Sequence, residues 1–204
     1  HWLGRVVSHK LVPVETFLMR TLGKIDADEV SRLRTHEYAR RYGSRADSDH
    51  LKWSHTDESF MNVGLFVTGP ASPNELISVM RLAYVKYALD FEKVILMDHG
   101  ATAYPLPVIV LGRAATAARY QSFGLHSILR RACLALARGA GVRSVVGTME
   151  IDSPRIKQLE DLGYEFVENT RPWDGFLKND QPILVARLPR EKIERAIETL
   201  DRRI

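Results

Sequence analysis

The sequence has few of the features that mark secreted, membrane-spanning or fibrous proteins. Cys133 is the only cysteine among 204 residues, so the chain cannot form an internal disulfide. No apolar run approaches the roughly 20 residues of a membrane-spanning helix, because the longest candidate, 106–111, contains Pro107. The residues present include no recognisable signal peptide, internal repeat or low-complexity tract. We therefore expect a cytoplasmic protein without integral membrane association.

The composition is that of an ordinary globular domain. Apolar residues make up 45% of the chain and charged residues 26%. We expect a single domain over 1–204, in which 1–25 has uncertain structure. Lys and Arg outnumber Asp and Glu by 29 to 25, a net charge of +4 that does not by itself indicate nucleic-acid binding. A basic nucleic-acid-binding module is the alternative from a different class, but the sequence has no zinc-finger spacing or aromatic-interleaved basic stretch to favour it.

Hydrophobic periodicity predicts an alternation of strands and helices. Helical spacing, caps and terminating glycines predict helices over 26–42, 123–140, 153–163 and from Pro189 onward. β-branched or alternating segments predict strands over 61–68, 75–85, 106–116, 142–150, 164–168 and 181–188. The segment 43–59 has the composition of a polar loop, and 87–104 has no clear pattern. The continuous β-α-β-α-β order after residue 106 predicts one mixed α/β domain.

The junction between strand 106–116 and the next helix has the chemistry of an anion site. Its residues are Gln121, Ser122, Phe123, Gly124, Leu125 and His126. Backbone N–H groups at a helix start are unpaired, and the positive end of the helix dipole lies there. Gly124 lets the backbone approach an anion without an intervening side chain. A capped helix start without a ligand is the alternative interpretation.

This junction resembles the Q/R-x-x-G-x-G/A phosphopantetheine loop of the GCN5-related N-acyltransferase superfamily. Leu162-Gly163-Tyr164 resembles the L-G-F element that ends the superfamily's next helix. The resemblance implies an α/β fold with a central mixed sheet flanked by helices, and transfer of an acyl group to an amine. Two positions depart from the pattern. His126 stands where the family has Gly or Ala, and Leu159 stands where a tyrosine often serves as general acid.

Upstream residues are similar to the acyl-homoserine-lactone synthases, whose donor is acyl carrier protein. The matching positions are Arg34, Asp57 or Glu58, and Arg81. Leu111-Gly112-Arg113 is similar to their E-x-x-R strand element, but Val110 occupies the glutamate position. Over about 26–190 the chain most resembles the long-chain N-acyl amino acid synthases. This resemblance implies transfer from the phosphopantetheine thioester of acyl carrier protein to an amino acid such as tyrosine. Coenzyme A-dependent acetylation and lactone synthesis are the alternatives.

Direct attack of an amine on a thioester requires four functions, and the sequence has candidates for each. Residues 121–126 would hold the donor phosphate, and backbone N–H groups near Leu111 and Arg113 would receive the developing oxyanion. Arg34 or Arg81 would bind the acceptor's carboxylate, the alternative being an internal ion pair with Asp57, Glu58 or Glu75. The candidate bases are Glu58, Glu92, Asp98, His99 and Glu150. We expect no metal site and no permanently bound cofactor.

Two further expectations concern the acyl donor. A long acyl chain requires an apolar slot, although every candidate residue would serve equally as ordinary core. These residues are Phe60, Leu65, Phe66, Met80, Leu82, Val108 and Val110. Carrier proteins are acidic, so arginines beside the pantetheine entrance predict a docking surface, the alternative being solvated helix faces. The arginines are Arg119, Arg130, Arg131, Arg138 and Arg143.

Overall fold

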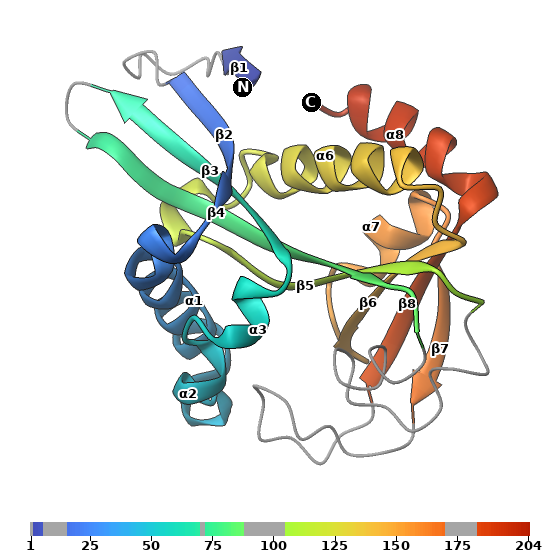
Figure 1. Cartoon of the computed structure of the whole chain (residues 1–204), viewed down its shortest axis with the longest axis horizontal. Coiled ribbons are helices and arrows are strands. Elements are labelled where there is room, and N and C mark those ends of the chain that lie inside the picture. The colour runs from blue at the N-terminus through green and yellow to red at the C-terminus, as the bar shows by residue number, and fades with distance from the viewer. Residues whose placement is uncertain (1, 6–15, 70–71, 88–104, 170–182) are drawn as a thin grey trace.

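The chain is built around one mixed sheet with helices on both faces (Figure 1). The computed structural model describes residues 2–5, 16–69, 72–87, 105–169 and 183–204. Its eight strands lie in the order β1-β2-β3-β4-β5-β6-β8-β7. They are β1 (Trp2–Arg5), β2 (Thr16–Leu22), β3 (Met61–Gly69), β4 (Ser72–Val85), β5 (Val108–Thr116), β6 (Ser144–Glu150), β7 (Glu165–Asn169) and β8 (Ile183–Pro189). The β5–β6 pair is parallel and the other neighbours are antiparallel.

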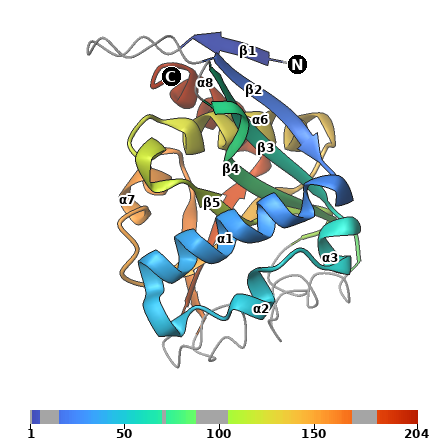
Figure 2. The same cartoon turned by 90° about the vertical axis from the view of Figure 1, so that its left-hand side faces the viewer.

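The helices divide between the two faces of the sheet. Figure 2 shows α1 to α3 in front of the sheet and α6 and α8 behind it. The front helices are α1 (Ala27–Tyr42), α2 (Ser48–Leu51) and α3 (His55–Glu58). The others are α6 (Leu125–Gly139), α7 (Ile156–Asp161) and α8 (Ile193–Asp201). The fold class predicted from the sequence is confirmed.

Strand alternation decides which side chains of β4 face which helices. Met80 and Leu82 pack in the larger core with α6 and α8. Val79 belongs to the core that α1 covers through Val30. Arg81 lies between Met80 and Leu82, so its side chain is on the α1 to α3 face of the sheet. A strand that is buried on both faces therefore carries one guanidinium group into the interior.

Each predicted strand and helix is present within the described residues, with ends displaced by a few residues. The prediction of a polar loop over 43–59 is wrong in part, because α2 and α3 lie within it. The Asp47 side chain caps α2 by accepting a bond from the Asp49 N–H at 3.0 Å. In α3, Ser54 and Asp57 form a capping box, a pattern that is visible in the sequence. The six acyl-slot candidates on the strands are all buried core residues.

The strands β5 and β6 pair over only part of their length. Their register joins 108–110 to 144–146, and β5 then continues to Thr116 with only β4 beside it. A Cβ at Gly147 would lie 3.2 Å from the Leu111 carbonyl oxygen, so the strands are still close where pairing ends. Beyond that point the β6–β8 half of the sheet turns away from the β2–β5 half (Figure 1). The later residues of β5 therefore have one edge that β6 does not cover.

Candidate active site

The loop before α6 presents unpaired backbone N–H groups, as the sequence predicts. Gly124 caps the helix with φ of 74°, a left-handed conformation that glycine adopts without steric cost. Within the part of the chain that the structure describes, the N–H groups of Gly124, Leu125 and His126 form no hydrogen bond. They lie at the positive end of a 15-residue helix. These features fit an anionic group such as a phosphate.

A pocket of about 480 Å³ opens beside this loop. Its walls are the second half of α1, residues 114–116 of β5, the loop itself and the start of α7. Arg40, Arg41 and Arg155 line it, against the single carboxylate of Glu37. The Arg155 guanidinium is half-buried and has no hydrogen bond or ion pair with a described residue. Burial lowers its pKa, and the nearby Arg130 and Arg41 lower it further. The pocket therefore has an excess of positive charge.

Side chains of the loop are less available than its backbone. The Gln121 amide donates to the Thr116 carbonyl oxygen at 2.9 Å and accepts from Arg40 Nη2 at 2.9 Å. The Ser122 and Phe123 side chains are exposed. His126 is half-buried, and burial lowers its pKa well below the ordinary value, with a further contribution from Arg155. Its imidazole is therefore neutral at pH 7, which leaves the backbone as the main anion contact of the loop.

No general acid lies at the position that the family pattern assigns to it. Leu159 is only 2% exposed and packs in the core. Tyr38 and Tyr42 of α1 line the pocket instead. Burial raises the pKa of Tyr42 to about 12, so its phenol stays protonated throughout the neutral range. The described residues thus offer hydroxyl groups to the pocket from α1 and not from α7.

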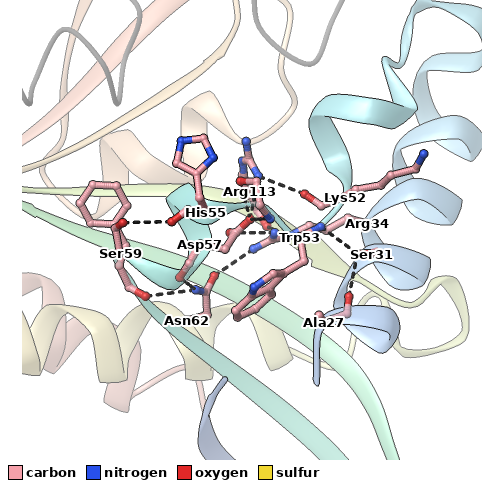
Figure 3. Close-up of polar contacts among 12 residues, drawn as sticks. Ala27, Ser31, Arg34, Lys52, Trp53, His55, Asp57, Ser59, Asn62 and Arg113 are labelled. Carbon is pink, nitrogen blue, oxygen red and sulfur yellow. Dashed lines mark hydrogen bonds and ion pairs between the residues drawn. The ribbon is translucent and has the colours of Figure 1, made fainter. Parts of the chain in front are cut away.

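A second polar cluster lies where α1, α3 and β5 meet (Figure 3). The Asp57 carboxylate is fully buried and accepts from Arg34 Nη1 at 2.9 Å and Arg113 Nη1 at 2.8 Å. Arg34 Nη2 also donates to Asn62 Oδ1 at 3.0 Å. Arg34, the largest fully buried side chain among the described residues, therefore forms the internal ion pair that the sequence left open as the alternative to substrate binding.

Among the described residues, Arg81 differs from Arg34 and Arg113 because it forms no ion pair. It is 6% exposed, and its Nη1 is buried without a hydrogen-bond partner among the described residues. Its guanidinium lies 5.7 Å from the centre of the Phe60 ring. Burial, together with the nearby charge of Arg113, lowers its pKa to about 10. Three guanidinium groups thus lie near one carboxylate, and no described residue accepts a hydrogen bond from Arg81 Nη1.

The backbone of β5 is bulged beside this cluster. Arg81 pairs with Gly112 and Val79 with Ala115, so Arg113 and Ala114 both lie opposite Met80. Arg113 has φ of 49°, which costs a non-glycine residue about 1–2 kcal/mol. Arg34 Nε donates to the Arg113 carbonyl oxygen at 3.2 Å and so stabilises the bulge. The bulge lies where β5 has left β6, which links the buried cluster to the uncovered strand edge.

The structure describes only two of the five candidate bases. Glu58 is exposed, and its carboxylate lies 3.5 Å from Lys24 Nζ. The Glu150 side chain is 13% exposed at the end of β6, with its carboxylate 3.4 Å from Arg45 Nη1 and 4.0 Å from Arg41 Nη2. Glu92, Asp98 and His99 lie outside the described residues. Leu111 is buried at the point where β5 and β6 part.

The predicted docking arginines do not form one surface beside the entrance. Arg138 lies in the last turn of α6 and Arg143 precedes β6, so both lie at the opposite end of that helix from Gly124. A 15-residue helix is about 22 Å long, which makes this part of the prediction wrong. Arg131 and Arg138 pair with α8, and Arg119 pairs with Glu75. Arg130 lies nearer the pocket and donates to the Tyr164 hydroxyl at 3.0 Å.

The described residues contain neither a membrane-spanning helix nor a cluster of metal ligands. No helix among them is both long and apolar enough to cross a membrane. In the same residues, no group of three or more His, Cys, Asp or Glu side chains is placed to hold a metal ion.

Comparison with known proteins identifies the fold. No protein-family model and no curated protein matches the chain. Among solved structures, FeeM, an N-acyl amino acid synthase from uncultured soil microbes, matches with a TM-score of 0.59, 15% identity and coverage of 88% of this chain and 95% of that one. BjaI, a coenzyme A-dependent acyl-homoserine lactone synthase, matches with a TM-score of 0.57 and 14% identity, and the match covers 91% of this chain and 90% of that one.

The ribosomal-protein-S18-alanine N-acetyltransferase from Escherichia coli matches with a TM-score of 0.53, 15% identity and coverage of 85% of this chain and 93% of that one. At these identities the similarity defines the fold. The chain therefore has the fold of the GCN5-related N-acyltransferases, which its loop and helix motifs predicted.

Proposed function

We propose that the protein is an N-acyltransferase that transfers an acyl group from a phosphopantetheine thioester to the α-amine of an amino acid. The observation that carries this proposal is Arg81, a buried guanidinium with an unpaired Nη1. It pairs through its backbone with Gly112, next to the bulge of β5. The donor pocket lies against residues 114–116 of the same strand. One strand thereby connects an anion-binding loop to a candidate carboxylate site.

The donor supplies an activated acyl carbon that the amine attacks directly, with the thiol as leaving group. The N–H groups of Gly124, Leu125 and His126 would hold its phosphate, assisted by Arg155. The edge of β5 that β6 leaves uncovered would align the pantetheine arm. A backbone N–H of 111–113 would stabilise the developing oxyanion, an effect worth about 3–4 kcal/mol for one good donor. The chain needs no nucleophilic side chain for this reaction.

The acceptor would enter on the α1 to α3 face of the sheet. Arg81 can bind a carboxylate through two parallel N–H bonds, a geometry that lysine does not reproduce. The α-ammonium group of the acceptor must lose a proton before it attacks. Glu150 is the best placed described candidate for the base, because it ends β6 and its side chain is mostly buried. Glu58, Glu92, Asp98 and His99 remain the other candidates.

The finer proposal is that the donor is a long-chain acyl group on acyl carrier protein. It is supported by the sequence resemblance to the N-acyl amino acid synthases and by the structural similarity to FeeM. Arg40 and Arg41, both exposed at the pocket, provide positive charge for an acidic partner. Coenzyme A as the donor is the alternative.

The test compares acyl carrier protein and coenzyme A carrying the same long acyl chain, with mass spectrometry of the products. We expect N-acyl amino acids, formed faster from the carrier protein. A strong preference for acyl coenzyme A would refute acyl carrier protein as the donor, but the proposal of an acyltransferase would still stand. Release of methylthioadenosine from added S-adenosylmethionine would identify a lactone synthase. Salt-sensitive nucleic-acid binding without acyl transfer to any amine would refute the whole proposal.

A further inference from the structure

Glu37 of α1 makes four polar contacts, two of which connect the helix to the segment that leads into the donor loop. One oxygen accepts from the Ala118 backbone N–H at 2.9 Å, and the other accepts from Gln121 Nε2 at 3.2 Å and Arg40 Nε at 3.0 Å. The His36 ring nitrogen Nδ1 lies 3.2 Å from the first oxygen. Gln121 is bound in turn to Arg40 and to the Thr116 carbonyl oxygen. We call Glu37, Arg40 and Gln121 the loop clasp.

The loop clasp fixes the segment that leads into the anion site. Ala118 begins the short 3-10 helix Ala118–Tyr120, and Gln121 follows it directly. Three residues later, Gly124 turns the chain into α6. The Glu37 side chain is 6% exposed, and both of its oxygens are used. A buried carboxylate with this many donors is held in one position, and it holds the loop in turn.

The charge of Glu37 is unfavourable for the proposed phosphate, although the neighbouring arginines stabilise it. The pocket that Glu37 lines is otherwise basic and is proposed to bind a phosphate. A negative charge close to that phosphate opposes its binding. Glu37 therefore has two effects of opposite sign on the donor. Its charge weakens donor affinity, whereas its contacts hold the loop in the conformation that presents the Gly124 turn.

We propose that Glu37 is a positioning residue for the donor, acting through Ala118 and Gln121. This inference rests on the proposed function, because it assumes that the pocket binds the pantetheine phosphate. In Glu37→Gln the side chain keeps its size and can still accept from Ala118. Its NH₂ group faces the donors Gln121 Nε2 and Arg40 Nε, so those two contacts are lost. The loop clasp is therefore weakened, even though the substitution removes the negative charge that would repel the donor phosphate.

The experiment measures the dissociation constant of free coenzyme A by calorimetry, because coenzyme A carries the pantetheine phosphate. We expect Glu37→Gln to weaken coenzyme A about tenfold, from the loss of buried hydrogen bonds. In turnover, the KM for the donor should rise, whereas the KM for the amino acid should stay within about twofold. A tighter complex with coenzyme A would mean that only the charge of Glu37 acts and would overturn the inference. So would an unchanged affinity.

The matched control is Glu29→Gln, the same substitution on an exposed residue of the same helix, which should leave coenzyme A affinity unchanged. Gln121→Met breaks the clasp from the loop side and should weaken coenzyme A in the same direction, which keeps the test valid if Glu37→Gln unfolds. Wild-type protein that binds neither coenzyme A nor acyl carrier protein would refute the proposed function itself. If the wild-type protein binds coenzyme A and both Glu37→Gln and Gln121→Met bind it equally well, only the role of Glu37 is refuted.

Discussion

The two ends of the candidate site bind their proposed anions by different means. At the donor end, backbone N–H groups of consecutive residues face the pocket, and the nearby Gln121 and Arg40 side chains are bound to each other. At the acceptor end, side chains from α1, α3, β4 and β5 meet, and Arg34 reaches Arg113 across 79 positions of sequence. At the donor end the proposed anion contacts come from one local turn, which α1 holds in place through Glu37 and Arg40. At the acceptor end the charged side chains themselves come from several elements of the fold. Substitutions should therefore affect them differently.

The largest effect should follow from Asp57→Asn. The Asp57 carboxylate is the counter-charge for Arg34 and Arg113, and Arg81 lies in the same cluster. Removing one partner of a buried ion pair leaves the other charge uncompensated and costs about 3–5 kcal/mol. We expect a fall of that size in the free energy of unfolding, measured with urea. Asp49→Asn, which disturbs an exposed pair with Lys52, should leave the free energy of unfolding almost unchanged. Equal losses in both variants would contradict the buried cluster.

Arg81→Met should separate stability from function. The folded protein holds the pKa of Arg81 at about 10, below its ordinary value of 12.5, so the charged form is disfavoured by folding. At pH 7 the variant should be more stable by about 1–3 kcal/mol, while the KM for the amino acid rises at least about tenfold. The stability gain should shrink as the pH rises through 10, because the wild-type guanidinium then loses its charge in the folded state.

Arg20→Met is the control for that prediction. The Arg20 guanidinium donates to Asp26 at 2.6 and 2.9 Å, so its charge is paired. The same substitution should therefore lower stability by about 1–2 kcal/mol, the opposite sign. A loss of stability in Arg81→Met would show that the Arg81 charge is satisfied within the protein.

Gly124→Ala should act mainly on the donor. A Cβ at Gly124 would meet no atom within 4 Å, but φ of +74° is strained for alanine, at a cost of about 1 kcal/mol. We expect that loss of stability and a raised donor KM. Gly139→Ala lies at the other end of α6 without a positive φ and should stabilise the protein by up to about 1 kcal/mol. If both substitutions changed the stability in the same direction, the left-handed turn assigned to Gly124 would be contradicted.

The smallest effect should come from Arg138→Glu. This exposed arginine pairs with Glu194 of α8, far from the donor loop. We expect a change of about 1 kcal/mol or less in stability and an unchanged donor KM. Arg41→Glu, at the pocket, should instead raise the donor KM, most strongly with acyl carrier protein. If Arg138→Glu and Arg41→Glu raised the donor KM equally, acyl carrier protein would have to dock along the whole length of α6.

The difference between the two ends also explains what the sequence could predict. Gly124 and the following helix are consecutive residues, so their chemistry is visible without a structure. Arg34 and Arg81 are equivalent candidates in the sequence, and only the fold gives Arg34 the Asp57 carboxylate and leaves Arg81 Nη1 unpaired. The sequence reasoning missed Glu37 and Asn62, because their partners come from other elements. It missed Arg155 because the pocket that this residue lines is formed by other elements. The Ser54 to Asp57 capping box was the one local signal for α3, and reading 43–59 as a loop overlooked it.

The most direct test of the account offers the protein tyrosine and tyramine, which differ only in the carboxylate, with the same acyl carrier protein donor. If Arg81 binds the carboxylate, tyrosine should be acylated at least about tenfold more efficiently than tyramine in kcat/KM, and Arg81→Met should remove the difference. Equal use of both amines by the wild-type protein would contradict a carboxylate-bearing acceptor and the role of Arg81 with it.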